Sequence, residues 1–271
     1  MRSSATERLP ILGIKGDDDR VLVETREYPW SAIGRLNNTL GPFCSGTLIG
    51  PKRVLTAAHC LWNRRTRTWL PPCALHFLAG YQRSSYLAHS LVVSYEIAGK
   101  TPAAGAGHPP SLTGDWAILT LAEDLSSVVD AVPTASLDPA LKSRYLRQGG
   151  VFLQAGYSRD RPHILTRHDN CQLEGFGAED HLVQHQCDAT FGDSGSPILL
   201  SYNGNYRVVA IHLATDNKQG KGIALTGLAF HEQLQNLDPP QTMGREFKAC
   251  QMPMDDYQIA ERKLHQSFTK Q

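Results

Sequence analysis

The residues best suited to chemistry lie between Asp188 and Pro197, in the stretch DATFGDSGSP. Ser194 has an acid directly before it, a glycine directly after it and a second glycine two positions earlier. Glycines let the backbone turn sharply and let another backbone approach closely. A nucleophilic serine needs an exposed hydroxyl and nearby backbone N–H groups that can hold an oxyanion. By itself the stretch fits either a nucleophile or a plain surface turn.

Two further motifs favour the nucleophile. His59 lies in LTAAHC and Asp115 lies in GDWAIL, so the chain order is His, Asp, Ser. A neutral imidazole can take the serine proton and later return it to a leaving group, while a carboxylate holds the ring in one tautomer. The three motifs together resemble the trypsin/chymotrypsin-like serine endopeptidases, over roughly residues 18 to 237.

The resemblance implies a role for each residue of the motifs. Ser194 would attack the peptide carbonyl, His59 would act as general base and acid, and Asp115 would orient the imidazole. The backbone N–H groups of Gly192 and Ser194 would form the oxyanion hole. The implied activity is hydrolysis of a protein or peptide substrate through an acyl-enzyme intermediate.

Specificity is ambiguous and rests on the resemblance. Asp188, six positions before the nucleophile, falls at the base of the primary pocket, where a carboxylate would recruit Lys or Arg. Ala189 also suits such a pocket. His212 instead falls where glutamyl endopeptidases of the bacterial branch carry a pocket histidine, although their hydroxyl residue at the position of Ala189 is missing. We predict a Lys/Arg preference ahead of an acidic one. The plain alternative is that His212 packs in its strand and Asp188 turns into a loop.

Two other functions stay open. The chain could be an inactive binding protein on the same scaffold, although retention of the triad argues against that. It could also be a zymogen, with residues 1–20 as a mobile arm or a propeptide that is cut after Pro10 or Arg20. In the resembling family the new N-terminal ammonium pairs with an acid at the position of Asp193. Asp-Arg at 19–20 followed by Pro29–Trp30 instead resembles the bacterial branch, in which this segment belongs to the mature chain.

Composition limits the partners. The formal charge of +1 among 271 residues predicts no general attraction to nucleic acid or to an anionic membrane. No apolar run reaches about 18 residues, so we expect no membrane span. We expect no cofactor and no metal. The acids at 17–19 lack the spacing of an EF-hand. His181 and His185 are expected to be surface residues, as are His163 and His168. The oligomeric state is open.

The six cysteines suit an oxidised protein. The resemblance implies a bond between Cys44 and Cys60 behind the catalytic histidine. Cys171 and Cys187 bracket the segment before the nucleophile and are the next plausible pair, which leaves Cys73 and Cys250. The first eight residues lack the apolar core of a signal peptide, so we expect a secreted or periplasmic protein whose leader is absent from this sequence.

The elements that must position these residues are mostly strands. Short apolar runs separated by Gly, Pro and Asn predict an all-β chain. The expected strands cover residues 31–36, 46–49, 53–58, 75–79, 91–97, 116–121, 149–156, 163–173, 197–202, 207–213 and 222–228. The resemblance implies two six-stranded antiparallel β-barrels, at 21–125 and 126–245, with the site between them. We expect a helix to begin near Phe230 and the tail at 246–271 to be helical.

Overall fold

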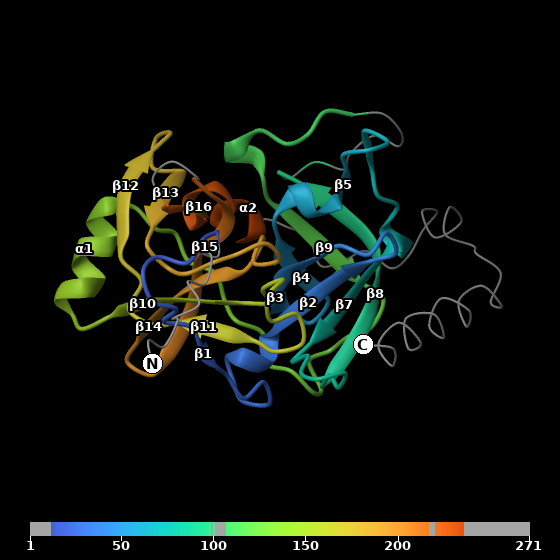
Figure 1. Cartoon of the computed structure of the whole chain (residues 1–271), viewed down its shortest axis with the longest axis horizontal. Helices are drawn as coiled ribbons and strands as arrows, with labels where there is room; N and C mark the ends of the chain where they lie inside the picture. Colours follow the sequence, from blue (N-terminus) through green and yellow to red (C-terminus); the bar gives the residue numbers. More distant parts are fainter. Residues whose placement is uncertain (1–11, 99, 101–106, 217–219, 236–271) are drawn as a thin grey trace, which may run out of the picture.

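The first half of the chain forms a closed six-stranded barrel. A computed structural model describes residues 12–98, 100, 107–216 and 220–235, and Figure 1 shows two β units lying beside each other. The barrel runs in the order β2-β3-β4-β9-β8-β7. Its strands are β2 (Ile33–Asn38), β3 (Phe43–Gly50), β4 (Arg53–Thr56), β7 (Leu75–Ala79), β8 (Ala88–Ile97) and β9 (Ala117–Leu121), and a separate hairpin joins β5 (Trp62–Asn63) to β6 (Thr68–Trp69).

The second half forms a curled eight-stranded sheet in the order β1-β11-β10-β14-β15-β16-β13-β12. Its strands are β1 (Val21–Leu22), β10 (Val151–Gly156), β11 (Thr166–His168), β12 (Leu173–Gly177), β13 (Leu182–His185), β14 (Pro197–Tyr202), β15 (Asn205–Thr215) and β16 (Gly222–Thr226). The expectation of two β units is confirmed. Within the described residues the second unit does not close as a six-stranded barrel, because β1 and β12 remain its edges.

A continuous apolar core fixes the two units to each other. The larger buried cluster draws residues from both halves, including Leu36 of β2 and Tyr157 just after β10. The Tyr157 side chain is fully buried, and its hydroxyl donates to the carbonyl oxygen of Tyr81, 2.7 Å away in the first unit. Burial of this extent resists relative movement of the units. Residues from the two halves can therefore meet in one well-defined site.

Two helices accompany the sheets. Helix α1 (Pro139–Arg147) lies on the outside of the second unit and was not predicted from the sequence, although Asp138 accepts a hydrogen bond from Leu141 N at 2.7 Å and proline opens the first turn. Helix α2 (His231–Gln235) begins directly after Phe230, as expected. The tail at 246–271, for which a helix was predicted, lies outside the described residues.

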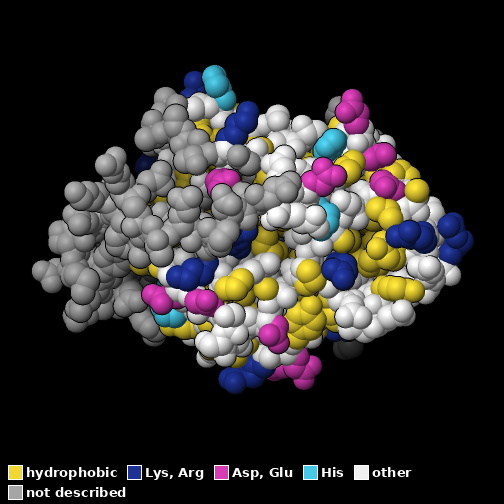
Figure 2. Space-filling model, turned by 180° about the vertical axis from the view of Figure 1, so that it is seen from behind, with side chains coloured by type: hydrophobic (Ala, Val, Ile, Leu, Met, Phe, Trp, Pro, Cys, Tyr) yellow, Lys and Arg dark blue, Asp and Glu magenta, His cyan; other side chains and the backbone are white. Residues whose placement is uncertain are grey.

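Two of the expected disulfides are present. Cys44 pairs with Cys60, and Cys171 pairs with Cys187. Cys73 is also disulfide-bonded, and Cys250, the other remaining cysteine, lies outside the described residues. On the face seen in Figure 2, positive and negative side chains are scattered among one another, in keeping with the formal charge of +1. Among the described helices, none has the length and apolar character needed to cross a bilayer.

Candidate active site

The pairing of β4 with β9 brings His59 and Asp115 together. Thr56 is paired with Ala117, so the turn after β4 and the turn before β9 lie at the same end of the barrel. His59 Nδ1 lies 2.7 Å from Asp115 Oδ2, and His59 backbone N donates to the other carboxylate oxygen at 2.7 Å. A carboxylate can only accept, so Nδ1 carries the proton and Nε2 is left bare. The imidazole is thereby prepared to accept a proton.

Ser194 lies in the loop before β14 and faces the same cavity of about 950 Å³ as His59. The backbone of Ser45 holds the loop by donating to Ser194 O at 2.9 Å. Gly195 follows with a φ of +78°, and a Cβ there would lie 2.3 Å from Thr56 Oγ1. No hydrogen bond joins the Ser194 hydroxyl to the His59 ring. Such contacts are often long until substrate binds.

The loop before Ser194 leaves backbone donors free. Gly192 has a φ of +99°, and a Cβ there would lie 2.7 Å from Tyr157 O, so only glycine fits. The carbonyl oxygen of Phe191 accepts from Arg159 N at 2.5 Å. Because C=O and N–H of a trans peptide point in opposite directions, Gly192 N–H points away from Arg159. Neither Gly192 N–H nor Ser194 N–H has an acceptor among the described residues, so both can serve an oxyanion.

Asp193 is buried and is held by neutral donors. Ser158 Oγ donates to its Oδ2 at 2.6 Å, and Thr190 N donates to the same oxygen at 2.7 Å. Burial raises the pKa of the carboxyl to about 6, against the effect of these hydrogen bonds. No lysine or arginine within the described ranges forms an ion pair with it. The hydroxyl and the amide thus occupy the role that the resemblance gives to a new N-terminal ammonium.

Asp188 does not face the cavity. Its fully buried carboxylate accepts from the backbone N–H groups of Lys15 at 2.8 Å and Asp19 at 3.1 Å. Burial opposes the charged form, but the nearby His168 ring, whose Nδ1 lies 3.5 Å from the carboxylate, and these hydrogen bonds outweigh it and hold the pKa of the carboxyl below its ordinary value. Ala189 is also buried, and its N–H donates to Gly13 O at 3.1 Å. Neither residue lines the cavity. The structure therefore gives Asp188 the loop environment that was the plain alternative.

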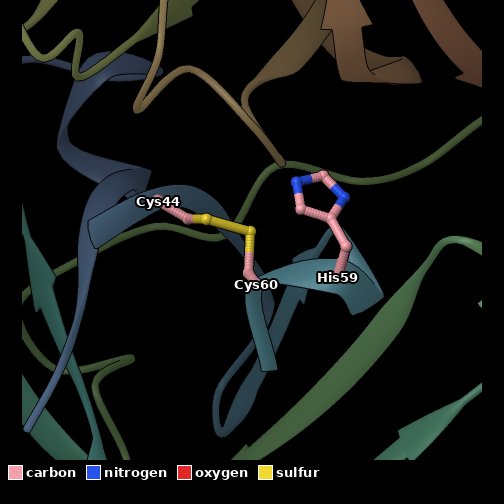
Figure 3. A group of neighbouring side chains, drawn as sticks. All are labelled: Cys44, His59 and Cys60. Atoms are coloured by element: carbon pink, nitrogen blue, oxygen red, sulfur yellow. A yellow bond between two sulfur atoms is a disulfide. The ribbon is translucent and has the colours of Figure 1, made fainter. Parts of the chain in front are cut away.

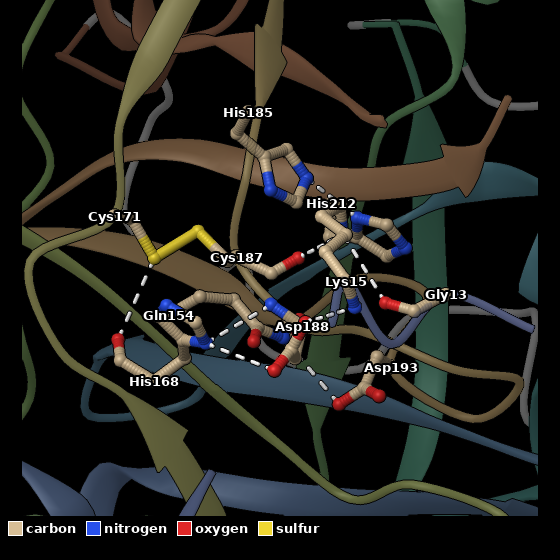
Figure 4. Close-up of a disulfide and its surroundings, with 11 residues drawn as sticks. Gly13, Lys15, Gln154, His168, Cys171, His185, Cys187, Asp188, Asp193 and His212 are labelled. Atoms are coloured by element: carbon tan, nitrogen blue, oxygen red, sulfur yellow. Dashed lines mark hydrogen bonds and ion pairs between the residues drawn. A yellow bond between two sulfur atoms is a disulfide. The ribbon is translucent and has the colours of Figure 1, made fainter. Parts of the chain in front are cut away.

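His212 on β15 does line the cavity, and it rests on a second histidine. His185 Nε2 lies 2.8 Å from His212 Nδ1 (Figure 4). Burial, together with the charges of Lys15 and His59, lowers the pKa of His212 to about 3, so the ring is neutral at ordinary pH. His185 is also buried, and burial and its charged neighbours lower its pKa well below the ordinary value.

The hydrogen bond between the two histidines indicates their tautomers. His185 Nδ1 is buried without a partner. An unpaired buried N–H is rarer than an unpaired acceptor, which favours a bare Nδ1 and a proton on His185 Nε2. That proton is donated to His212 Nδ1, so His212 carries its own proton on Nε2. The side chain at the cavity wall is then a neutral hydrogen-bond donor.

Three residues near the pocket were missed by the sequence analysis. His185 and His168 were expected at the surface, yet His185 is fully buried and His168 interacts with Asp188. Lys15 was placed in a mobile arm, yet its ammonium bonds the carbonyl oxygens of Gly13 and Cys187 at 3.1 and 2.5 Å. No spacing in the sequence signals these contacts, because Lys15 and Cys187 are separated by 172 positions.

One cluster has the geometry of a metal site but different chemistry. Cys44, His59 and Cys60 have their ligand atoms within 4.8 Å of one another. Figure 3 shows the two sulfur atoms bonded to each other beside the His59 ring. A disulfide offers no thiolate, so this cluster is not a metal centre. His181 and His185 do not meet on a helix face: His185 ends strand β13, and His181 lies in the turn before it and bonds Ala178 O.

Comparisons with known proteins agree with this arrangement. A family model described as "Trypsin" matches residues 21–229. The chain is 40% identical over 63 residues to the protein named "Glutamyl endopeptidase" of Bacillus licheniformis, a match covering 23% of this chain and 20% of that protein. It is 40% identical over 67 residues to "CLIP domain-containing serine protease HP8" of Bombyx mori, covering 22% of this chain and 18% of that protein. The matches thus span about a fifth of each curated relative.

A solved structure shares the fold. "Structure of Glu endopeptidase in complex with MPD" superposes with a TM-score of 0.64 at 20% identity, covering 82% of this chain and 97% of that chain. At this identity the likeness establishes a common architecture of two β units. The activity must be argued from the residues of the site.

Proposed function

This chain belongs to the trypsin family of serine proteases, and from that membership we propose that it hydrolyses peptide bonds in protein substrates through an acyl-enzyme intermediate. The observation that carries the proposal is the doubly hydrogen-bonded pair of His59 and Asp115 beside the cavity that Ser194 also lines. A bare imidazole Nε2 and a serine hydroxyl that line one cavity are the groups that general-base activation needs.

The proposed reaction has two symmetrical halves. Ser194 Oγ attacks the carbonyl carbon while its proton passes to His59 Nε2, and Asp115 stabilises the imidazolium that forms. The negative charge on the carbonyl oxygen is received by the N–H groups of Gly192 and Ser194. His59 then gives the proton to the leaving amine, the C–N bond breaks, and an ester to Ser194 remains. A water molecule then attacks the ester carbonyl in the same way, with His59 taking its proton, which releases the carboxylic acid and restores the Ser194 hydroxyl.

For specificity we propose an acidic P1 side chain in place of the Lys/Arg preference expected from the sequence. A Lys/Arg pocket needs a free carboxylate, whereas both oxygens of Asp188 are engaged away from the cavity. The cavity wall instead offers the Nε2–H of His212, a donor suited to a carboxylate. The names of two similar proteins, a glutamyl endopeptidase and a Glu endopeptidase, support this choice.

We further propose that activity needs no cleavage within the described part of the N-terminal segment. Asp193 already has donors from Ser158 and Thr190, so no ammonium is required to hold its loop. The Arg20 side chain, beside one candidate cleavage point, is only 1% exposed. This favours residues 12–20 as part of the working enzyme rather than a propeptide. The Cys44–Cys60 and Cys171–Cys187 disulfides support a secreted or periplasmic setting. We also propose that the boundary between the two β units lies near residue 125.

Cleavage of a peptide library with varied P1 residues by the purified chain tests the proposal. We expect cuts after Glu and Asp. Cuts after Lys and Arg would return the specificity role to Asp188. No cleavage at all by the intact chain, with labelling of Ser194 by a phosphonofluoridate also absent, would favour the inactive binding protein or the zymogen. Removal of the segment before Val21 would then separate those two.

A further inference from the structure

The ammonium of Lys15 is held close to the pocket without a carboxylate partner. Figure 4 shows the side chain reaching toward the His212 ring, with its Nζ bonded to the carbonyl oxygens of Gly13 and Cys187. Among the described residues, no carboxylate oxygen lies within ion-pair distance of this Nζ. Burial lowers the pKa of Lys15, while the more distant charges of Asp188 and Asp193 act in the opposite direction.

The position of Lys15 is fixed from several sides. Its backbone N–H binds the buried carboxylate of Asp188. Two residues earlier, Gly13 has a φ of +96°, and a Cβ there would lie 1.9 Å from Ala189 O. Leu12, at the start of the described segment, lines the cavity itself. The N-terminal segment is therefore wedged against the pocket wall, and the lysine cannot swing freely into solvent.

An acidic substrate side chain needs a positive charge that the histidines do not supply. His212 and His185 are both neutral, so this pair offers a hydrogen bond but no charge. Lys15 Nζ is bonded to the carbonyl oxygen of Cys187, two residues after His185, so its charge lies close to the wall that the two rings form, and it lowers the pKa of both. It also offsets the negative charge of Asp188, which would otherwise repel a second carboxylate from the pocket.

We infer that Lys15 supplies the positive charge that makes the primary pocket selective for a carboxylate side chain, acting through the neutral donor His212. The inference rests on the proposed function and adds a specificity-determining residue to it. Lys15 does not line the cavity. Its charge therefore acts on the substrate carboxylate through His212 and not by direct contact. The N-terminal segment is accordingly a working part of the specificity pocket.

Arg64, Arg65 and Arg159 also line the cavity, and Arg159, whose backbone N–H bonds Phe191 O in the loop before Ser194, is taken as the competing source of charge. Its side chain is exposed, and water and salt screen an exposed charge far more than a buried one. The proposal therefore assigns selectivity to the buried ammonium. Variants at both positions separate the two sources.

The test uses two peptides that are identical except for Glu or Gln at P1, since these side chains have nearly the same shape and differ in charge. For Lys15→Met we expect the ratio of kcat/KM for Glu over Gln to fall roughly tenfold or more, with a much smaller change for the Gln peptide. Lys52→Met is the matched control, because that ammonium also bonds a carbonyl oxygen, Ala122 O at 2.8 Å, on the first barrel. Lys52→Met and Arg159→Gln should keep the ratio.

Active-site titration with a phosphonofluoridate confirms that each variant retains a working Ser194. If Lys15→Met does not fold, Lys15→Gln carries the same test, because its amide can still donate to a carbonyl oxygen. An unchanged Glu/Gln ratio in an active Lys15 variant overturns the inference and leaves the proposed function standing. The inference is also overturned if the Glu/Gln ratio of kcat/KM falls in Arg159→Gln but not in Lys15→Met. A wild-type chain that cleaves but shows no preference for Glu overturns both the inference and the acidic specificity.

Discussion

Ser158 Oγ lies 2.6 Å from Asp193 Oδ2, and this buried hydrogen bond connects the end of β10 to the loop that carries the nucleophile. Asp193 directly precedes Ser194, so whatever holds its side chain also shapes the backbone that must receive an oxyanion. A neutral hydroxyl performs this task without introducing a buried charge pair. The protonation of Asp193 therefore becomes a property of the folded protein that can be measured.

Asp193→Asn should change how stability depends on pH. The folded pKa of about 6 is above the ordinary 3.8, so the folded chain binds this proton more tightly than the unfolded chain. The resulting stabilisation is complete below pH 3.8 and is lost as pH rises through 6. Between pH 4 and pH 7 the free energy of unfolding of wild type should fall relative to the variant by about 2 kcal/mol. Urea unfolding of both proteins across this pH range measures the difference. If their free energies of unfolding change with pH in parallel, the prediction is wrong.

Ser194→Ala should abolish hydrolysis and leave the fold intact. The change removes one oxygen that makes no hydrogen bond with the described residues, so we expect a free energy of unfolding within about 0.5 kcal/mol of wild type. Peptide hydrolysis and thermal unfolding, measured on the same preparation, check both parts. Turnover retained in this variant would contradict the nucleophile assignment.

Gly192→Ala should damage catalysis more than stability. The new Cβ would crowd Tyr157 O and Phe43 and displace the peptide that presents the Gly192 N–H. Loss of one oxyanion donor should lower kcat about a hundredfold or more. Gly204→Ala is the matched control, since its φ is +72° but nothing lies within 4 Å of the added atom. That control should lose about 1 kcal/mol of stability and keep its activity. Equal kcat values for the two variants would count against the proposed oxyanion hole.

Arg20→Met should loosen the N-terminal segment. The Arg20 guanidinium is 1% exposed and bonds Asp18 at 2.9 Å and Asp160 at 2.6 Å, while Asp160 also accepts from Thr190 Oγ1 at 2.9 Å. Its removal leaves two partly exposed carboxylates unpaired, so we expect a loss of about 2 kcal/mol in the free energy of unfolding. Arg26→Met, at an exposed position, should cost little. Urea titration of both variants decides, and equal losses would contradict the role of Arg20.

The parts of the molecule that were predictable from sequence are those whose contacts follow from local pattern. The motifs around His59 and Asp115 lie at the ends of apolar strand runs, and the first barrel follows from six such runs. The strand expected at 163–173 is divided between β11 and the start of β12, and β13 was missed because its polar residues hide the alternation. Helix α1 was also missed, although Asp138 and Pro139 are recognisable start signals.

The pocket was less predictable for a physical reason. Asp188 was expected to meet substrate because the family resemblance places the base of the pocket six positions before the nucleophile. Its actual partners are backbone groups at Lys15 and Asp19, more than 160 positions away. Backbone donors carry no residue-specific signature, so no pattern in the sequence could reveal that this carboxylate was already satisfied. The same holds for the bond between His185 and His212, which depends on the register of separate strands.

The close contact between Gly13 and Ala189 also ties the pocket to two segments that are far apart in the chain. During synthesis the N-terminal segment leaves the ribosome first, yet the surface that it packs against emerges some 170 residues later. Until then Lys15 has no carbonyl oxygen of Cys187 to bind, and the wall beside His212 is incomplete. The first barrel can fold while this segment waits. The selectivity pocket is consequently complete only when segments some 170 residues apart are both in place, whereas the pairing of His59 with Asp115 needs the first barrel alone.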